Sequence, residues 1–146
     1  MIVPDVNLLI YAVHRESPHH ETARAWLDAV LNGDEPVGFA WTVLMGFVRV
    51  ITNARVMSGR PLTVEQALAV VDVWLTRPMA STVEPGTGHW AIFRQLLIEA
   101  RRGANLTTDA HLAALCIERG ATLVSADSDF QRFRGLRYEN PLLGAR

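Results

Sequence analysis

Four aspartates stand at positions where a parallel sheet would place functional side chains. Asp5 directly follows the apolar segment MIVP, and Asp127 and Asp129 follow ATLVSA, which also reads as a buried strand. Asp109 lies in the first turn of a helix predicted over 107–120. Ligands of open α/β sheets bind at the carboxyl ends of the strands, so acids from separate parts of the chain are expected to meet there.

Asp5 is the hardest of these acids to explain as a surface residue. Its neighbours in MIVPDVNLLIYAV are strongly apolar, and an unpaired carboxylate buried among them costs several kcal/mol. Asp5, Asp109 and Asp127 would also repel one another unless a cation joined them. Carboxylates without thiols suit a hard divalent ion, so we expect Mg²⁺ or Mn²⁺ at this edge of the sheet.

Each of the other acids also has a purely structural interpretation. Asp109 at a helix N-terminus would stabilise the helix dipole by roughly 0.3–1 kcal/mol. Asp127 could cap the short helical turn expected over 127–133, and Asp129 could be a solvated surface acid. These alternatives stay open at the level of the sequence.

Apolar periodicity predicts strands that alternate with helices along the whole chain. Ser17 and Pro18 are suited to the start of one helix, and Thr63 with Gln66 has the spacing of a capping box at the start of another. The inner stripe of that second helix is predicted to be Val64, Leu68, Val71 and Leu75. The expected strands are 1–4, 36–40, 79–84, 121–126 and 135–140, and the expected helices are 17–33, 42–54, 63–77, 88–102 and 107–120.

This alternation indicates an α/β fold, in which a mainly parallel sheet of four to five strands is covered by helices on both faces. With no linker or internal repeat, a single domain over 1–146 is expected.

The longest apolar stretch, VGFAWTVLMGFV, has twelve residues and is too short to span a bilayer. Asp5 also interrupts the N-terminal run before a signal-peptide core could form, so we expect a cytoplasmic protein without a membrane partner. The single Cys116 is expected to be a core residue.

The basic residues exclude several classes of protein. All fourteen are Arg, and the chain contains no Lys, which a Walker A loop and a pyridoxal Schiff base both require. Response-regulator receivers and haloacid-dehalogenase-like phosphatases also depend on a Lys, and the phosphatases carry Asp-x-Asp where this chain has Asp5-Val6-Asn7. A G-x-S-x-G elbow is absent, and no Cys or paired His spacing completes a zinc site around His14, His19 and His20.

Four segments together resemble the PIN-domain nucleases, and in particular the VapC-type toxins of bacterial toxin–antitoxin pairs. They are DVNLLIYAV, VLMGFVRVIT, NLTTDAHLAALCIERGATLVSADSDF and GLRYENPL, and the resemblance covers nearly the whole chain. The third is the most specific, because an acid opens a helix rich in small residues, and a Gly, an apolar strand and SADSDF then follow. The resemblance implies a PIN-like three-layer α/β/α sandwich.

The resemblance also implies the residues of the site. The metal-binding acids are Asp5, Asp109 and Asp127, and Asp129 matches a frequent further acid, so that all four are candidate catalytic residues. The implied reaction is hydrolysis of RNA phosphodiester bonds, in which a bound Mg²⁺ or Mn²⁺ activates a water molecule and neutralises charge on the phosphate.

Three further positions near these acids matter to this interpretation. Asn7 and Ser125 match polar residues that lie beside the metal ligands in the family. Gly46 stands where the family usually places a Glu, in the helix after the second strand, so this cluster is one carboxylate smaller. That departure keeps a second hypothesis open, in which the protein is a catalytically weak or inactive PIN-like module that binds RNA or protein.

The resemblance finally implies partners. VapC-type proteins usually form homodimers and are neutralised by a small VapB-like antitoxin, which presents an Arg to the acids. The RNA substrate would be held on aromatic and Arg surfaces, and His111 could lie at the rim of the site. The candidate RNA contacts are Trp41, Trp90, Arg49, Arg132 and Arg134; core packing is the alternative role of the two Trp residues.

Overall fold

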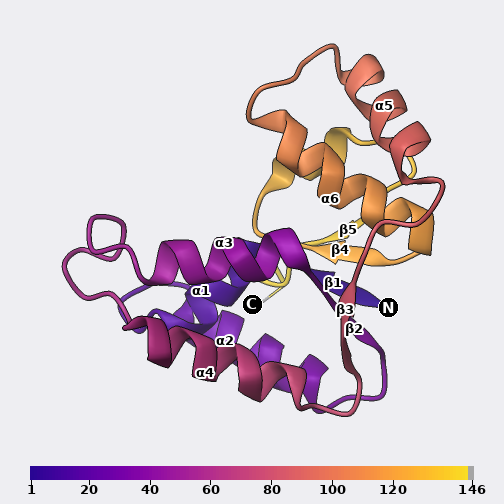
Figure 1. Cartoon of the computed structure of the whole chain (residues 1–146). Helices are drawn as coiled ribbons and strands as arrows, with labels where there is room; N and C mark the ends of the chain where they lie inside the picture. The colour runs from indigo at the N-terminus through magenta and orange to yellow at the C-terminus, as the bar shows by residue number, and fades with distance from the viewer. Residues whose placement is uncertain (145–146) are drawn as a thin grey trace.

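The computed structural model describes residues 1–144 and contains five strands and six α-helices within them (Figure 1). The strands are β1 (Ile2–Pro4), β2 (Val37–Ala40), β3 (Ala80–Val83), β4 (Thr122–Val124) and β5 (Arg137–Glu139). The helices are α1 (Val6–Val13), α2 (His20–Leu31), α3 (Trp41–Ile51), α4 (Val64–Leu75), α5 (His89–Ala100) and α6 (Leu106–Arg119), and a short 3₁₀ helix, η1, covers Ser128–Arg132.

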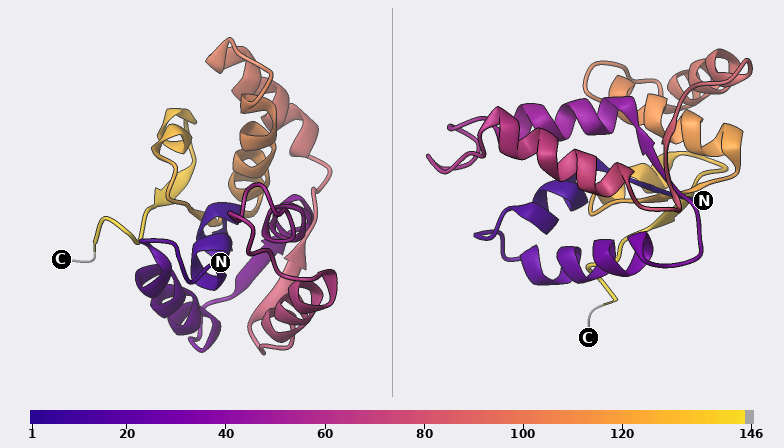
Figure 2. Two further views of the ribbon diagram at one scale, coloured as in Figure 1. Left: turned by 90° about the vertical axis from the view of Figure 1, so that its left-hand side faces the viewer. Right: turned by 60° about the horizontal axis from the view of Figure 1, so that its bottom comes forward.

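The strands form one sheet in the order β3-β2-β1-β4-β5, and every pairing is parallel. Right-handed crossovers from β1 to β2 and from β2 to β3 place α1–α4 on one face. The return crossover from β3 to β4 runs in the opposite direction and places α5 and α6 on the other face, as Figure 1 shows. Figure 2 shows the α5–α6 pair apart from α1–α4 in both of its views. The predicted three-layer α/β/α arrangement with a parallel sheet is therefore confirmed.

The strand order reverses between β1 and β4, which is where a doubly wound sheet opens a crevice for ligands. Pro4 at the end of β1 is in register with Val124 at the end of β4. The residues that follow these two strands therefore emerge side by side. The N-terminus of α6 lies at the same edge, because α6 leads back to the start of β4.

Helix α1 is the element that the sequence did not predict. Its eight residues are almost all apolar, so neither a helical nor a strand period stands out in them. In the structure Leu8, Leu9 and Ala12 are buried, and Asp5 forms the N-cap with a side chain that accepts from the backbone N–H of Val6. The chain therefore turns into a helix directly at the acid that ends the first strand.

Helix α4 starts as predicted but presents a different face to the core. The Thr63–Gln66 capping box is present. The predicted inner stripe holds for Val71 and Leu75, which pack partly buried against the core. It is wrong for Leu68, which is 49% exposed, and for Val64, which is exposed as well. Ala67 and Trp74 face the core instead.

Trp74 is a central part of this core. It is 6% exposed, and its ring stacks on that of Phe39 with a centroid distance of 5.9 Å and contacts that of Phe47 at 4.8 Å. These contacts join α4 to β2 and α3, so the larger aromatic side chain determines which of two apolar stripes turns inward.

Two smaller expectations had mixed outcomes. Helix α2 begins at His20 rather than after Ser17, whose hydroxyl accepts from the backbone N–H of His19 in the preceding turn. Cys116 is buried among core residues, as predicted. Of the helices in residues 1–144, none is both long and apolar enough to cross a membrane.

The orientation of α4 can be tested by truncating one side chain on each stripe. Trp74→Ala should lower the free energy of unfolding by about 3–5 kcal/mol, because it leaves a cavity between β2 and α3. Leu68→Ala should lower it by less than about 1 kcal/mol, because the side chain is half exposed. Urea denaturation measures both, and a larger loss for Leu68→Ala would contradict the observed orientation.

Candidate active site

Asp5 is buried at the carboxyl end of β1 and is held by hydrogen bonds to both of its carboxylate oxygens. Its Oδ1 accepts from the backbone N–H of Val6 at 2.7 Å. Its Oδ2 accepts from the Ser125 hydroxyl at 2.7 Å and from Nδ2 of Asn7 at 3.2 Å. Its own backbone N–H donates to the carbonyl of Val124 at the end of β4. The switch point between β1 and β4 therefore fixes the position of this carboxylate.

Ser125 and Asn7 connect the two strand ends. Ser125 is fully buried, and its Oγ accepts from the backbone N–H of Asp127 at 3.0 Å and from Nδ2 of Asn7 at 3.1 Å. Oδ1 of Asn7 accepts from the backbone N–H of Ala126 at 3.2 Å. The two residues that the sequence placed beside the acids thus orient Asp5 and the segment that carries Asp127.

Asp127 and Asp129 occupy the turn after β4. Asp127 caps η1, because its Oδ1 accepts from the backbone N–H of Asp129 at 2.9 Å, so the capping role considered from the sequence is real. This does not remove Asp127 from the site, since its charge acts on both Asp5 and Asp109. Asp129 is exposed and pairs with Arg132 at 3.5 Å.

Asp109 lies in the first turn of α6 and is half-buried opposite the other acids. Burial, followed by repulsion from Asp5, Asp127 and Asp129, raises the pKa of Asp109 to about 6. Burial also raises the pKa of Asp5, although the hydrogen bonds from Ser125 and Val6 oppose the shift. The aspartates of three separate segments are thus close enough for their charges to oppose one another's ionisation.

The cluster is more open than a closed coordination shell. Across residues 1–144, no three Asp, Glu, His or Cys side chains are arranged so that they could hold a metal ion by themselves. The charges of Asp5 and Asp127 nevertheless act on Asp109, so the three acids lie in one neighbourhood. An ion held by few protein ligands keeps several of its water molecules, as Mg²⁺ usually does.

Gly46 lies on the side of α3 that faces α1. A Cβ atom at this position would lie 3.4 Å from Cγ2 of Val6, which is an ordinary van der Waals contact. Packing therefore does not require a glycine here. A longer side chain would start beside the residue that follows Asp5, where the missing carboxylate was expected from the sequence.

The candidate RNA-binding residues fall on three different surfaces. Trp41 and Arg49 line an apolar groove of about 420 Å³ between α3 and α4. Arg132 and Arg134 line a cavity of about 460 Å³ that they share with Arg101. The third surface is a pocket beside α5 that contains Trp90 and His111. Trp41 is 47% exposed and Trp90 is 69% exposed, so neither has the core-packing role that was the alternative for them.

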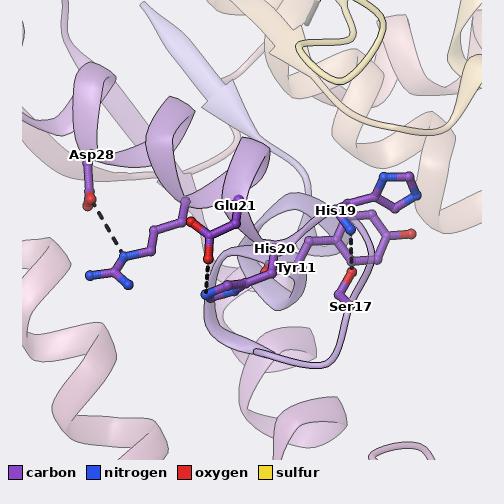
Figure 3. A network of polar contacts seen from close by, with 7 residues as sticks. Tyr11, Ser17, His19, His20, Glu21 and Asp28 are labelled. Atoms are coloured by element: carbon purple, nitrogen blue, oxygen red, sulfur yellow. Dashed lines mark hydrogen bonds and ion pairs between the residues drawn. The ribbon is translucent and has the colours of Figure 1, made fainter.

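The three histidines near the start of α2 form no metal site with one another. Figure 3 shows His19 and His20 pointing to different partners. His20 is buried, and its Nδ1 lies 2.9 Å from the carbonyl oxygen of Tyr11, whereas the ring of His19 packs on the ring of Tyr11 at 5.1 Å. His20 thus joins α2 to the end of α1.

Tyr138 of β5 and His89 of α5 are residues near the acids that the sequence did not single out. Burial and the charge of Asp127 raise the pKa of the Tyr138 hydroxyl. His89 lies 2.9 Å from Nδ1 of His111, and burial followed by this neighbour lowers the pKa of His111. His111 belongs with His89 to a pocket that also includes Thr107 and Thr108 from the first turn of α6. From the sequence, only the parallel pairing of β5 with β4 could have indicated that Tyr138 lies near the acids.

The raised pKa of Asp109 predicts how stability depends on pH. A carboxyl group with a higher pKa in the folded state favours folding below its unfolded pKa of 3.8 and loses that contribution as pH rises through about 6. At pH 7.5 without metal ions, Asp109→Asn should therefore be more stable than wild type. Its free energy of unfolding should be higher by about 1 kcal/mol after allowance for solvent screening. The difference should vanish near pH 4. Thermal melts of the two proteins at both pH values measure the difference in stability. If Asp109→Asn is less stable than wild type at pH 7.5, repulsion does not act on Asp109 as described.

Gly46 allows a second stability test. Gly46→Ala should raise the free energy of unfolding by about 0.5–1 kcal/mol, because Ala has the higher helix propensity and its methyl group fits against Val6. Denaturant titration of the two proteins gives this difference. A loss of stability would mean that α3 and α1 need the close approach that only glycine permits.

Comparison with known proteins agrees with this geometry. The model of the PIN-domain family matches residues 2–136. Ribonuclease VapC37 of Mycobacterium tuberculosis is 45% identical over 141 residues, which cover 97% of each protein. Ribonuclease VapC43 of the same species is 43% identical over 144 residues, which cover 99% of this chain and 97% of that protein.

Solved structures share the fold at lower identity. VapBC2 from Rickettsia felis, bound to a promoter DNA fragment, contains a chain with a TM-score of 0.70 and 19% identity, and the match covers 96% of this chain and 98% of that one. Mycobacterium tuberculosis VapC20, a toxin that cleaves the sarcin–ricin loop, has a TM-score of 0.64 and 18% identity, with 94% and 99% covered. From its match to the family model and its curated relatives, this chain belongs to the PIN-domain family, among the VapC ribonucleases.

Proposed function

We propose that this protein hydrolyses RNA phosphodiester bonds with a divalent cation bound by Asp5, Asp109 and Asp127, and that it acts as the toxin of a toxin–antitoxin pair. The observation that carries the proposal is the convergence of these acids at the switch point, where burial and then repulsion from Asp5, Asp127 and Asp129 raise the pKa of Asp109 to about 6. A structural cluster would contain a basic partner for such charges. Arg132, whose charge lowers the pKa of Asp109, already pairs with Asp129.

The donor set fits Mg²⁺ or Mn²⁺. All three proposed ligands are carboxylates, and buried Cys116, with a thiol pKa raised to about 12, does not supply a thiolate. A cation bound here would lower the pKa of a coordinated water and neutralise negative charge on the scissile phosphate. A site with few protein ligands leaves room for that water and for a phosphate oxygen.

Each residue around the acids has a defined part in this proposal. Ser125 and Asn7 hold Asp5 in one orientation through its Oδ2, while the backbone N–H of Val6 binds its Oδ1. Asp129 is exposed and its charge acts on Asp109, and in this proposal it orients an attacking water molecule. Hydrolysis then proceeds by direct attack of water, without a covalent intermediate on the protein.

The names of the relatives support the substrate and the partner. The curated relatives are called VapC ribonucleases, and the matched structure from Rickettsia felis is a VapBC complex. The groove between α3 and α4, lined by the exposed side chains of Trp41, Met45 and Leu68, offers an apolar surface for a VapB-like antitoxin. An RNA substrate also agrees with the expected cytoplasmic location, and homodimer formation stays a prediction.

Gly46 is the observation that keeps a second candidate function, a PIN-like module that binds RNA without cutting it. The cluster lacks the carboxylate that the family usually supplies from α3. A Cβ atom at this position would make only an ordinary contact with Val6, so packing does not explain the missing side chain. A measurement of cleavage separates the two functions.

Purified protein without antitoxin should cleave cellular RNA when Mg²⁺ or Mn²⁺ is present and should stop when EDTA is added. Asp5→Asn and Asp109→Asn should each lower the cleavage rate by more than about 100-fold, since loss of a ligand exceeds the effect of losing its supporting partners. Gel electrophoresis of end-labelled RNA measures the rate.

Asp72→Asn provides the matched control, because Asp72 is an exposed acid on α4 and its variant should cleave like wild type. Cleavage that survives both Asp5→Asn and Asp109→Asn would reject the proposed metal site. If wild type binds RNA but cleaves none with either ion, the binding module is the correct function.

A further inference from the structure

A pocket of about 360 Å³ lies between the beginnings of α3, α5 and α6, and the first turn of α6 also carries Asp109. Trp90 and Phe93 form its wall on α5, and Thr42, Thr107 and Thr108 line it from α3 and α6. His89 and His111 complete the lining. No Asp, Glu or Arg side chain contributes, which disfavours a phosphate or another strongly charged group as the occupant.

The aromatic wall is accessible and ordered by its own contacts. The side chain of Trp90 is 69% exposed, although an indole of this size normally covers apolar surface. Its ring lies 5.6 Å from the ring of Phe93, and the ring of His89 stacks on Phe93 at 6.2 Å with an interplanar angle of 14°. Exposed aromatic faces of this kind stack on unpaired nucleobases.

The histidine pair adds polar groups with fixed directions. Nε2 of His89 lies 2.9 Å from Nδ1 of His111, so one of these two nitrogens donates to the other. Nδ1 of His89 is buried without a hydrogen-bond partner in the part of the chain that the structure describes. A buried nitrogen of this kind favours a ligand or water that can hydrogen-bond to it.

The loop that leads into α5 is held rigidly, so the pocket is built before any ligand arrives. Glu118 of α6 accepts from the backbone N–H of Gly86 at 2.7 Å and from that of Gly88 at 2.8 Å. A Cβ atom on Gly86 would lie only 2.7 Å from a carboxylate oxygen of Glu118, so a larger residue there would displace this carboxylate. The loop therefore presents His89 and Trp90 in one arrangement.

The pocket and the proposed RNA site share the first turn of α6. Thr107 and Thr108 line the pocket and directly precede Asp109, and Thr42 lies one turn before Gly46 on α3. An RNA strand whose phosphate lies at the aspartates would therefore pass the mouth of the pocket with an adjoining nucleotide. Unpaired bases of RNA are typically held by aromatic stacking and hydrogen bonds to their edges.

We infer that this pocket, lined by Trp90, Phe93 and the His89–His111 pair, binds one unpaired nucleobase of the RNA, next to the scissile phosphate. The inference rests on the proposed ribonuclease function and names the part of the substrate that the site recognises. Stacking on Trp90 supplies affinity, and the histidines and threonines contact the edge of the base.

Binding of RNA without cleavage tests this inference. Fluorescence anisotropy in EDTA would compare a short labelled polyadenosine RNA with an abasic oligonucleotide of the same length. Trp90→Ala should weaken binding of the polyadenosine about tenfold and leave binding of the abasic oligonucleotide unchanged. Trp90→Phe should recover most of the lost affinity, because it restores an aromatic face.

Val73→Ala is the matched control, since Val73 is an exposed apolar residue on α4 and its loss should change neither affinity. Circular dichroism should show that Trp90→Ala folds like wild type, as expected for so exposed a side chain. Equal binding of polyadenosine by wild type and Trp90→Ala, or an equal loss with both oligonucleotides, would overturn the inference. If the nucleobase inference fails in this way but wild type still cleaves RNA, the proposed ribonuclease function is unaffected. If wild type neither binds nor cleaves RNA, the nucleobase inference and the ribonuclease function are both rejected.

Discussion

The structure depends on a balance between the repulsion of three carboxylates and the hydrogen bonds that keep them together. Asp5 is buried, and its two oxygens are engaged by Val6, Ser125 and Asn7. Asp109 faces it across the sheet edge, and its pKa rises to about 6 under burial and the charges around it. Without a cation this arrangement costs stability at neutral pH, and such strain is typical of functional sites. The remaining structure maintains it, because the parallel pairing of β1 with β4 fixes two of the three segments that carry acids, and α6 carries the third.

One set of interactions serves both the fold and the site. Asp5 starts α1 as its N-cap, and Asp127 starts η1 in the same way, so each acid is oriented by the helix that it begins. Ser125 then joins the two segments through a hydroxyl that both donates and accepts. Because the same hydrogen bonds start the helices and orient the acids, a site with few carboxylates can still be well ordered. At Gly46, α3 contributes no carboxylate to this site, and a Cβ atom there would make only an ordinary contact with Val6.

The sequence predicted the strands, the parallel sheet and the edge at which the acids meet, because apolar runs ending in Asp are strong local signals. It did not predict α1, because residues such as Leu8 and Leu9 belong to an unbroken apolar run without a period. It misplaced the inner face of α4, because two apolar stripes compete there and only contacts with Phe39 and Phe47 favour Trp74. The pairing of His89 with His111, 22 residues apart, depends on how α5 packs against α6 and has no local signal.

Direct titration with Mn²⁺ tests the central claim most directly, because it needs neither RNA nor activity. Electron paramagnetic resonance at pH 7.5 would give the free Mn²⁺ concentration in the presence of wild type, Asp109→Asn and Asp72→Asn. If the acids at the switch point hold a cation, wild type and Asp72→Asn should bind Mn²⁺ with equal affinity, and Asp109→Asn should bind it at least about tenfold more weakly. Equal affinity of wild type and Asp109→Asn would contradict the account.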